Sequence, residues 1–213
     1  MGKRIGRKRL YSLDKLGQSE ETLDPGAAMS GAYGHGKVSR HGSEIITEIY
    51  VDLGAGQVYS PKTQKTGTII AHSGVLDSSG VQTAQAHIGR LTTAKNGIIN
   101  LVEVSCIETP VGGTTDIDLM AATGSLLSYS GSGGLATPAT GRDDMWTLVP
   151  GGGAWVIGES TAAALDTNRL STYQYLYLGV GASTISAGTN IYTAGKFVIR
   201  LFGIAQLDDV TND

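Results

Sequence analysis

The chain has 213 residues and a formal net charge of −3, with 31 glycines, 5 prolines and a single cysteine. Charged residues make up 16% and hydrophobic residues 40%, whereas globular chains average about 25% charged residues and roughly 7% glycine. One cysteine excludes an internal disulfide framework, and the absence of 18 consecutive apolar residues excludes a membrane-spanning helix. The composition predicts a core of many short strands joined by tight glycine turns.

Charge is distributed unevenly along the chain. The first ten residues, MGKRIGRKRL, contain five basic residues and no acid, so the remainder has 16 − 5 = 11 basic against 19 acidic residues, a balance of −8. A basic tip on an acidic body predicts an extended arm that docks on an acidic partner. No apolar run follows these charges, so a secretory signal is not expected. The predicted docking residues are the basic side chains and the apolar anchors after them: Lys3, Arg4, Arg7, Lys8, Arg9, Leu10, Tyr11, Leu13 and Leu16.

The first half of the chain divides into an arm and the start of a β domain. Residues 1–43 lack sustained periodicity and are predicted to form the basic arm and a glycine-rich loop, while residues 44–213 are predicted to form one domain. Strands are expected in EIITEIYVDL (44–53), in TGTIIAHS (66–73) and in NGIINLVEVSCIET (96–109). The register changes within the third strand, which predicts a bulge near Asn100. Cys106 alternates with its neighbours like a small buried hydrophobe.

The second half contains the strongest strand patterns. WTLVPGGGAWVIG (146–158) is interpreted as two short strands around a Pro-Gly turn, and STAAALDTNRL (160–170) as a short helix capped by Ser160. TYQYLYLGVG (172–181) and YTAGKFVIRLFGIA (192–205) alternate clearly, with Phe197, Ile199 and Leu201 on one face. Strands separated by glycine turns, with almost no helix, predict an all-β fold, an antiparallel β-sandwich or jelly roll with an extended N-terminal arm.

Several stretches imitate catalytic motifs. GAYGHGKVS (31–39) has the glycine and lysine spacing of a P-loop, but Val38 stands where the magnesium-binding hydroxyl should be, and a P-loop must run from a strand into a helix. A glycine loop is the favoured interpretation. His35 and His41 are expected in that loop and His72 and His87 at strand ends; the four show no metal-ligand spacing. GESTA (158–162) lacks the serine position of a nucleophile elbow. We therefore expect no enzyme, no metal and no cofactor.

Asp116 and Asp118, in the stretch CIETPVGGTTDIDL (106–119), form the most suggestive pair. Carboxylate oxygens suit Mg²⁺ and Ca²⁺, but several ligands must converge on one ion. On a strand both side chains share a face, while Ile117 and Leu119 point the opposite way. The favoured interpretation is an amphipathic strand with a structural role, because a sugar-nucleotide site with this motif would need an α/β domain that the pattern lacks.

The segments AHIGRLTTAKNGIINLVEVSCIETPVGGTTDIDL (86–119) and YQYLYLGVGASTISAGTNIYTAGKFVIRLFG (173–203) resemble virion structural proteins of tailed bacteriophages, of the cyanophage and marine-phage type. The similar parts are the AKNG turn, the ETPVGG and DIDL pair, and the closing YLYL and YTAGKFVI strands. The resemblance implies a non-enzymatic jelly-roll decoration (cement) protein on the capsid exterior, made in the host bacterial cytoplasm. It further implies binding to the major capsid protein and self-association as a homotrimer.

Two other functions remain as alternatives. A tail- or fibre-associated module that binds host glycans would expose aromatic side chains in a groove, with Trp146, Trp155 or the row Tyr173, Tyr175 and Tyr177 as candidates. A nucleic-acid binder would work through the arm, with an affinity that falls steeply with salt. The acidic body argues against nucleic acid as a partner, and no membrane partner is expected.

Overall fold

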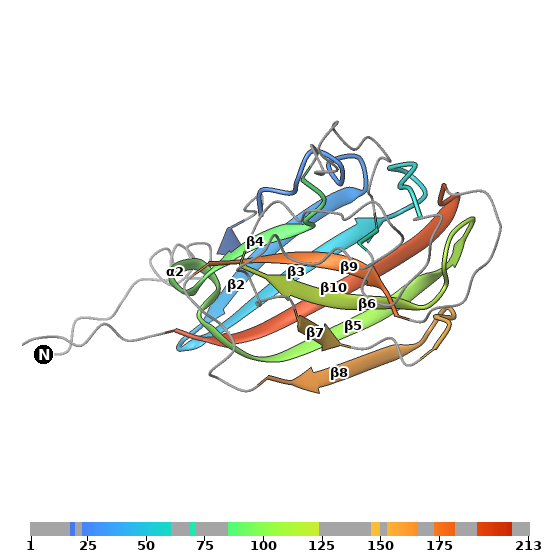
Figure 1. The fold of residues 1–213 in the computed structure, drawn as a ribbon. Coiled ribbons are helices and arrows are strands. Elements are labelled where there is room, and N and C mark those ends of the chain that lie inside the picture. Colours follow the sequence, from blue (N-terminus) through green and yellow to red (C-terminus); the bar gives the residue numbers. More distant parts are fainter. Residues whose placement is uncertain are drawn as a thin grey trace, which may run out of the picture.

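The computed structural model describes residues 18–19, 23–60, 69–70, 85–123, 146–149, 153–165, 173–181 and 191–205. Of these residues, 59% lie in strands and 3% in helix. The strands form two antiparallel sheets (Figure 1). The prediction of an all-β fold with less than about one-tenth helix is therefore confirmed.

The larger sheet has six strands in the order β1-β2-β3-β10-β5-β8. Their bounds are β1 Gln18–Ser19, β2 Tyr33–His41, β3 Glu44–Asp52, β10 Ala194–Ile204, β5 Ile98–Val111 and β8 Ser160–Ala164. The smaller sheet has four strands in the order β4-β9-β6-β7. Their bounds are β4 Gly89–Thr92, β9 Tyr173–Val180, β6 Ile117–Ala122 and β7 Trp146–Val149, and the short helix α2 (Thr93–Asn96) connects β4 to β5.

Side chains from both sheets form one buried cluster. On β10 the predicted alternation is confirmed: Phe197, Ile199 and Leu201 are buried, while the residues between them are half-buried. All six residues of β6 are buried, so both faces of that strand are covered. The ring of Trp155 meets that of Phe197 edge to face, with the centroids 5.7 Å apart, a favourable geometry for aromatic pairs.

The predicted bulge near Asn100 is present in β5. Opposite β10, Leu101 pairs with Phe202 and Ile99 pairs with Gly203, so Asn100 is the extra residue. The buried positions change phase at this point, from Ile99 to Val102, Val104 and Cys106. A strand side chain changes face when one residue is inserted, which explains the imperfect alternation of the sequence.

The predicted helix at 160–170 is wrong in its first half, because residues 160–164 form strand β8. Ser160–Ala164 pair with Ser105–Leu101 along the side of β5. Alanine favours helix in isolation, but five residues are too few to form a stable helix alone. The hydrogen bonds that β5 offers decide the conformation. Residues 166–170 lie outside the described part.

The predicted loop before residue 44 is also wrong in part, because Tyr33–His41 form strand β2, paired with β3. The glycines that suggested a loop serve close packing instead. A Cβ on Gly34 would collide with the ring of Tyr50, and a Cβ on Gly36 would collide with the hydroxyl of Tyr33. The boundary between arm and domain predicted at residues 43 and 44 therefore does not follow the sheet.

The interpretation of residues 146–158 as two strands is half right. β7 is the first strand, but residues 153–159 lie outside any strand. Gly153 and Gly158 have φ values of 147° and 89°, which break an extended chain. The N–H of Glu159 closes the turn on the carbonyl of Val156, at 3.0 Å.

Candidate interaction surface

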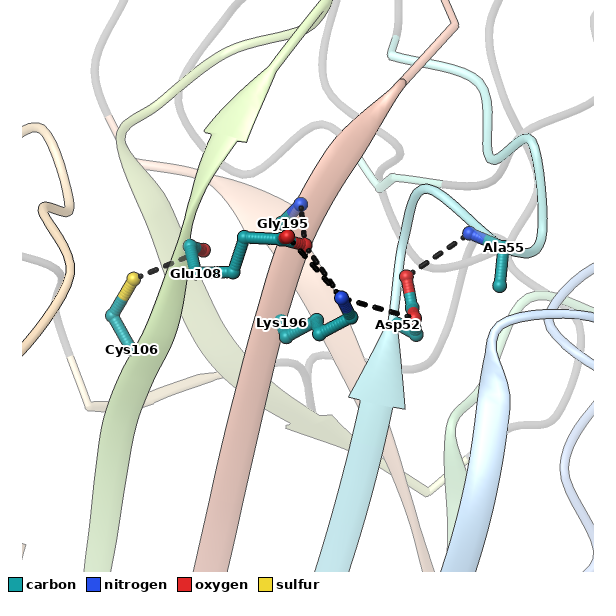
Figure 2. Close-up of polar contacts among 6 residues, drawn as sticks. All are labelled: Asp52, Ala55, Cys106, Glu108, Gly195 and Lys196. Atoms are coloured by element: carbon teal, nitrogen blue, oxygen red, sulfur yellow. Dashed lines mark hydrogen bonds and ion pairs between the residues drawn. The ribbon is translucent and has the colours of Figure 1, made fainter.

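The outward face of the six-stranded sheet carries a first row of charges across β3, β10 and β5. Asp52, Lys196 and Glu108 are cross-strand neighbours. The Nζ of Lys196 lies 3.1 Å from Oε2 of Glu108 and 3.8 Å from Oδ2 of Asp52 (Figure 2). The backbone N–H of Gly195 also donates to Glu108, at 3.2 Å, and that of Ala55 donates to Asp52, at 3.0 Å. Every charge in this row is thus paired within the sheet.

The pKa values of this row agree with the pairing. The pKa of the Glu108 carboxyl lies below its usual value, first because the Gly195 N–H donates to it and then because Lys196 does. The pKa of Lys196 is raised, chiefly by its hydrogen bond to Glu108. Both groups remain charged at neutral pH, so the row is a fixed surface feature and offers no proton-transfer group.

A second row of charges lies four residues further along β10 and β3. The Nε of Arg200 lies 2.9 Å from Oε2 of Glu48, and its Nη1 lies 3.9 Å from Oε2 of Glu103. Lys37 on β2 is the cross-strand neighbour of Glu48. Acids match or outnumber bases in both rows, so this face lacks the excess of positive charge that phosphate binding requires. The finding disfavours nucleic acid as the ligand of this face.

Beyond the second row the same face becomes apolar. Phe202 on β10 has Ile46 and Leu101 as its cross-strand neighbours, and Ile204 has Ile98. Leu101 is 37% exposed and Ile204 48% exposed, and the other three are half-buried. We call this group the apolar strip: Ile46, Ile98, Leu101, Phe202 and Ile204. Contiguous exposed apolar side chains with a polar border are typical of protein–protein contact sites.

The apolar strip was missed from the sequence for a definite reason. Its residues come from three strands that are far apart in the chain, and only the register brings them together. The usable signal was Phe202, which alternates out of phase with the buried Phe197, Ile199 and Leu201. A single outward apolar side chain is common on protein surfaces, so this signal becomes informative only when the register adds its apolar neighbours.

Asp116 and Asp118 lie side by side, but not on a solvated face. Gly179 on β9 stands opposite Asp118, and Gly181, just after β9, donates its N–H to the carbonyl of Asp116. A Cβ on Gly181 would collide with Oδ1 of both carboxylates. Asp118 is buried, and Oδ1 of Asp116 is buried and receives no hydrogen bond. Burial raises the pKa of Asp116, and the charge of Asp118 raises it further. The expectation of a simple amphipathic strand is corrected: β6 is buried on both faces.

The histidines occupy structural positions. His35 and His41 lie on β2, which corrects their expected place in a loop, and the His35 ring stacks on Tyr50 at 5.4 Å. The Nε2 of buried His87 donates to the carbonyl of Asp24 at 2.9 Å, and burial lowers its pKa. His72 lies outside the described residues. Within the described ranges, no three or more His, Cys, Asp or Glu side chains are grouped so that they could hold a metal ion.

Cys106 and the motif around Lys37 have no catalytic geometry. Cys106 is buried, as predicted, and burial raises its thiol pKa, which disfavours the nucleophilic thiolate. Its Sγ–H donates to the carbonyl of Glu108 at 3.3 Å (Figure 2). Lys37 lies within β2, which pairs antiparallel with β3 and enters no helix. The structure thus rejects a P-loop here.

Two of the aromatic residues proposed for a glycan site, Trp155 and Tyr177, are internal. Trp155 is only 3% exposed, and its Nε1–H donates to the carbonyl of Ile117 at 2.7 Å. Tyr177 is buried and Tyr175 is half-buried. A buried ring cannot stack on a sugar, so these positions count against the glycan-binding alternative. The side chains of Trp146 and Tyr173 lie outside the described part of the structure.

The residues predicted to form the docking arm all lie outside the described residues: Lys3, Arg4, Arg7, Lys8, Arg9, Leu10, Tyr11, Leu13 and Leu16. In the parts of the chain that the structure describes, no helix has the length and apolar character to cross a bilayer. Comparison with models of protein families, with curated proteins and with solved structures gave no significant match.

Proposed function

We propose that the protein is a non-enzymatic virion structural protein of the tailed-bacteriophage kind, which binds the exterior of the capsid as a decoration (cement) protein. In this proposal the two sheets form a β-sandwich of jelly-roll type. The partner is the major capsid protein, and copies of the chain associate as a trimer. The resemblance of residues 86–119 and 173–203 to phage virion proteins supports the capsid as the binding partner. The outward face of the six-stranded sheet supports a protein–protein contact.

The observation that carries the proposal is the apolar strip beside two rows of paired charges. Leu101 and Ile204 expose large side chains on a rigid sheet, while Lys196 and Arg200 are already paired with acids of neighbouring strands. Such a face can be covered by another protein without leaving an unpaired charge behind, which would be destabilising. The face is therefore better suited to binding another protein than to catalysis.

The side chains that could in principle act in catalysis have structural roles, which supports the same proposal. Burial disfavours the thiolate of Cys106, the Nε2–H of His87 is engaged by a backbone carbonyl, and Asp118 is buried in the smaller sheet. The Nε2 of His87 and the Sγ of Cys106 each donate to a backbone carbonyl. A binding role needs none of them.

The mechanism would be stabilisation by binding. A protein that binds the assembled shell more tightly than its open forms lowers the free energy of the assembled state. Many weak contacts on a lattice add through effective concentration, so each can be modest. The basic arm would steer the chain toward an acidic shell surface, and the apolar strip would provide the short-range contact.

The test is to compare phage particles that carry the protein with particles stripped of it. We expect the stripped shells to release their DNA at a lower temperature and to recover when the purified chain is added back. A fluorescent dye that reports released DNA measures the transition, and cosedimentation measures binding. Stripped shells that bind no chain and gain no heat resistance would contradict the proposal.

A further inference from the structure

Strand β8 forms one edge of the six-stranded sheet. Its five residues pair with β5, and none of the other described strands pairs with its opposite side. Figure 1 shows β8 at the lower margin of the sheet, with no labelled strand beyond it. An edge strand presents unpaired N–H and C=O groups, which can pair with another chain.

The register shows which backbone groups of β8 point away from β5. The N–H of Leu165 donates to the carbonyl of Asn100, and the N–H of Cys106 donates to the carbonyl of Glu159, at 2.8 Å each. Hydrogen-bonding direction alternates along a strand, so the odd-numbered residues 159–165 bond to β5. The N–H and C=O groups of Ser160, Ala162 and Ala164 therefore point to the open edge.

The side chains of this edge offer no protection against pairing. Natural edges are commonly guarded by lysine, proline or inward-pointing charges, but β8 reads Ser-Thr-Ala-Ala-Ala and has none of these. Ser160, Ala162 and Ala164 are exposed, and all three are small enough for another strand to approach. Among the strands that the structure describes, the six-stranded sheet thus has an edge that is both unpaired and neutral.

The start of β8 is held firmly in place. The N–H of Val156 donates to Oε2 of Glu159 at 2.8 Å, and the N–H of Gly158 donates to the carbonyl of Cys106 at 2.9 Å. The Oγ of Ser160 lies 3.1 Å from that of Ser105 on β5. Because β8 is already ordered, it loses little conformational entropy when a partner strand binds, and this favours association.

We propose that β8 is a self-association edge, at which two copies of the chain pair β8 with β8 antiparallel about a two-fold axis through Ala162. In this register Ala162 stands opposite its own copy and Ser160 opposite Ala164. All three outward-pointing residues of one copy then meet those of the other. The contact forms on the order of six backbone hydrogen bonds and joins the two sheets into one.

A second copy is the occupant that this edge fits best. The pattern of outward donors and acceptors is self-complementary in the antiparallel sense, as a two-fold contact requires. No charge is brought against its own copy at Ala162, and Glu103, the nearest acid on β5, would lie about three strand spacings from its copy, roughly 14 Å. At that distance salt screens the repulsion. The inference does not rest on the capsid assignment, and it adds a two-fold contact to any three-fold contact elsewhere.

The experiment measures the association of the full chain by sedimentation velocity across the micromolar range. The first variant is Ala162→Lys, which sets two lysines opposite each other. The second is Ala162→Pro, which removes only an outward N–H and leaves the bonds to β5 in place. The control is His41→Lys, the same added charge at an exposed position of β2. Urea unfolding checks that each variant keeps its fold.

We expect concentration-dependent pairing of the wild type and of His41→Lys, and a dissociation constant raised at least about tenfold in Ala162→Lys. As a second readout, a short bismaleimide should cross-link two copies of Ala162→Cys but not two copies of His41→Cys. The native Cys106 is buried and should not react. Pairing that is unchanged in Ala162→Lys and Ala162→Pro would overturn the proposal. So would a wild type that is monomeric throughout. If the wild type were monomeric and Ala162→Lys bound particles less well than the wild type, the β8 edge would instead pair with a strand of another protein.

Discussion

Asp116 has a buried carboxylate oxygen without a donor, close to the carboxylate of Asp118. Its pKa in the folded chain is raised above the ordinary value of 3.8, so folding favours the protonated form. The resulting stabilisation is complete below pH 3.8 and is lost as pH rises through the folded pKa. At neutral pH the ionised carboxylate therefore destabilises the fold.

Replacing Asp116 by Asn should raise the melting temperature at pH 7 and change it little at pH 3. A gain of about 1 kcal/mol would correspond to about 2–4 °C in a chain of this size. Thermal unfolding at pH 3, 5 and 7 measures the difference, with Glu44→Gln as an exposed control. A lower melting temperature at pH 7 would mean that the carboxylate has a stabilising partner.

The same pair should bind no required metal. The double variant Asp116→Asn, Asp118→Asn and the wild type should both show melting temperatures that are unaffected by Ca²⁺ or by chelator. The reason is that two carboxylates supply too few ligands to hold Ca²⁺ firmly. A clear rise with Ca²⁺ in the wild type, absent from the double variant, would reveal a cation site.

At the scale of single elements, α2 is fixed by one buried side chain. The Nδ2 of Asn96 donates to Oγ1 of Thr47 at 2.9 Å, and its Oδ1 accepts from the N–H of Thr92 at 2.9 Å. The next residue, Gly97, has φ 70° and ends the helix. The AKNG turn noted in the sequence is therefore a structural motif that ties α2 to β3.

Asn96→Ala should lower the free energy of unfolding by about 1–3 kcal/mol, because it leaves buried polar groups without partners. Urea unfolding measures the change. The matched control is Ala94→Gln in the same helix, at an exposed position, which should change stability by less than about 0.5 kcal/mol. Equal effects of the two substitutions would show that the Asn96 bonds do not hold the turn.

Elements could be predicted from the sequence where the alternation of apolar residues was long enough to identify a strand. β10 and the bulge at Asn100 could be predicted because apolar residues alternate over many positions. β8 and β2 could not, because alanine and glycine have no strand pattern of their own and the hydrogen bonds of β5 and β3 fix them. The apolar strip could not be predicted either, since it depends on register, whereas the burial of Cys106 followed from alternation alone.

At the scale of the whole molecule, the basic arm and the β body should have separable roles. Deleting residues 1–16 should leave the body folded but weaken attachment to stripped particles, because the arm supplies attraction to an acidic shell. Replacing Lys3, Arg4, Arg7, Lys8 and Arg9 by Gln should weaken attachment less, and more at low salt than at high salt. Cosedimentation with particles measures both variants. Undiminished occupancy would remove the arm from the mechanism, and tight binding of the arm to DNA would favour a nucleic-acid role.

The most direct test of the proposed attachment is the occupancy of stripped particles by a chain with an altered apolar strip. The double variant Leu101→Asn, Ile204→Asn removes its two most exposed side chains. The control is Ile157→Asn, which makes the same kind of change at a position that is 65% exposed and outside the strip. If the strip is the contact with the shell, the double variant should bind at least about tenfold more weakly, while the control and the wild type bind equally. Full occupancy by the double variant would contradict the account.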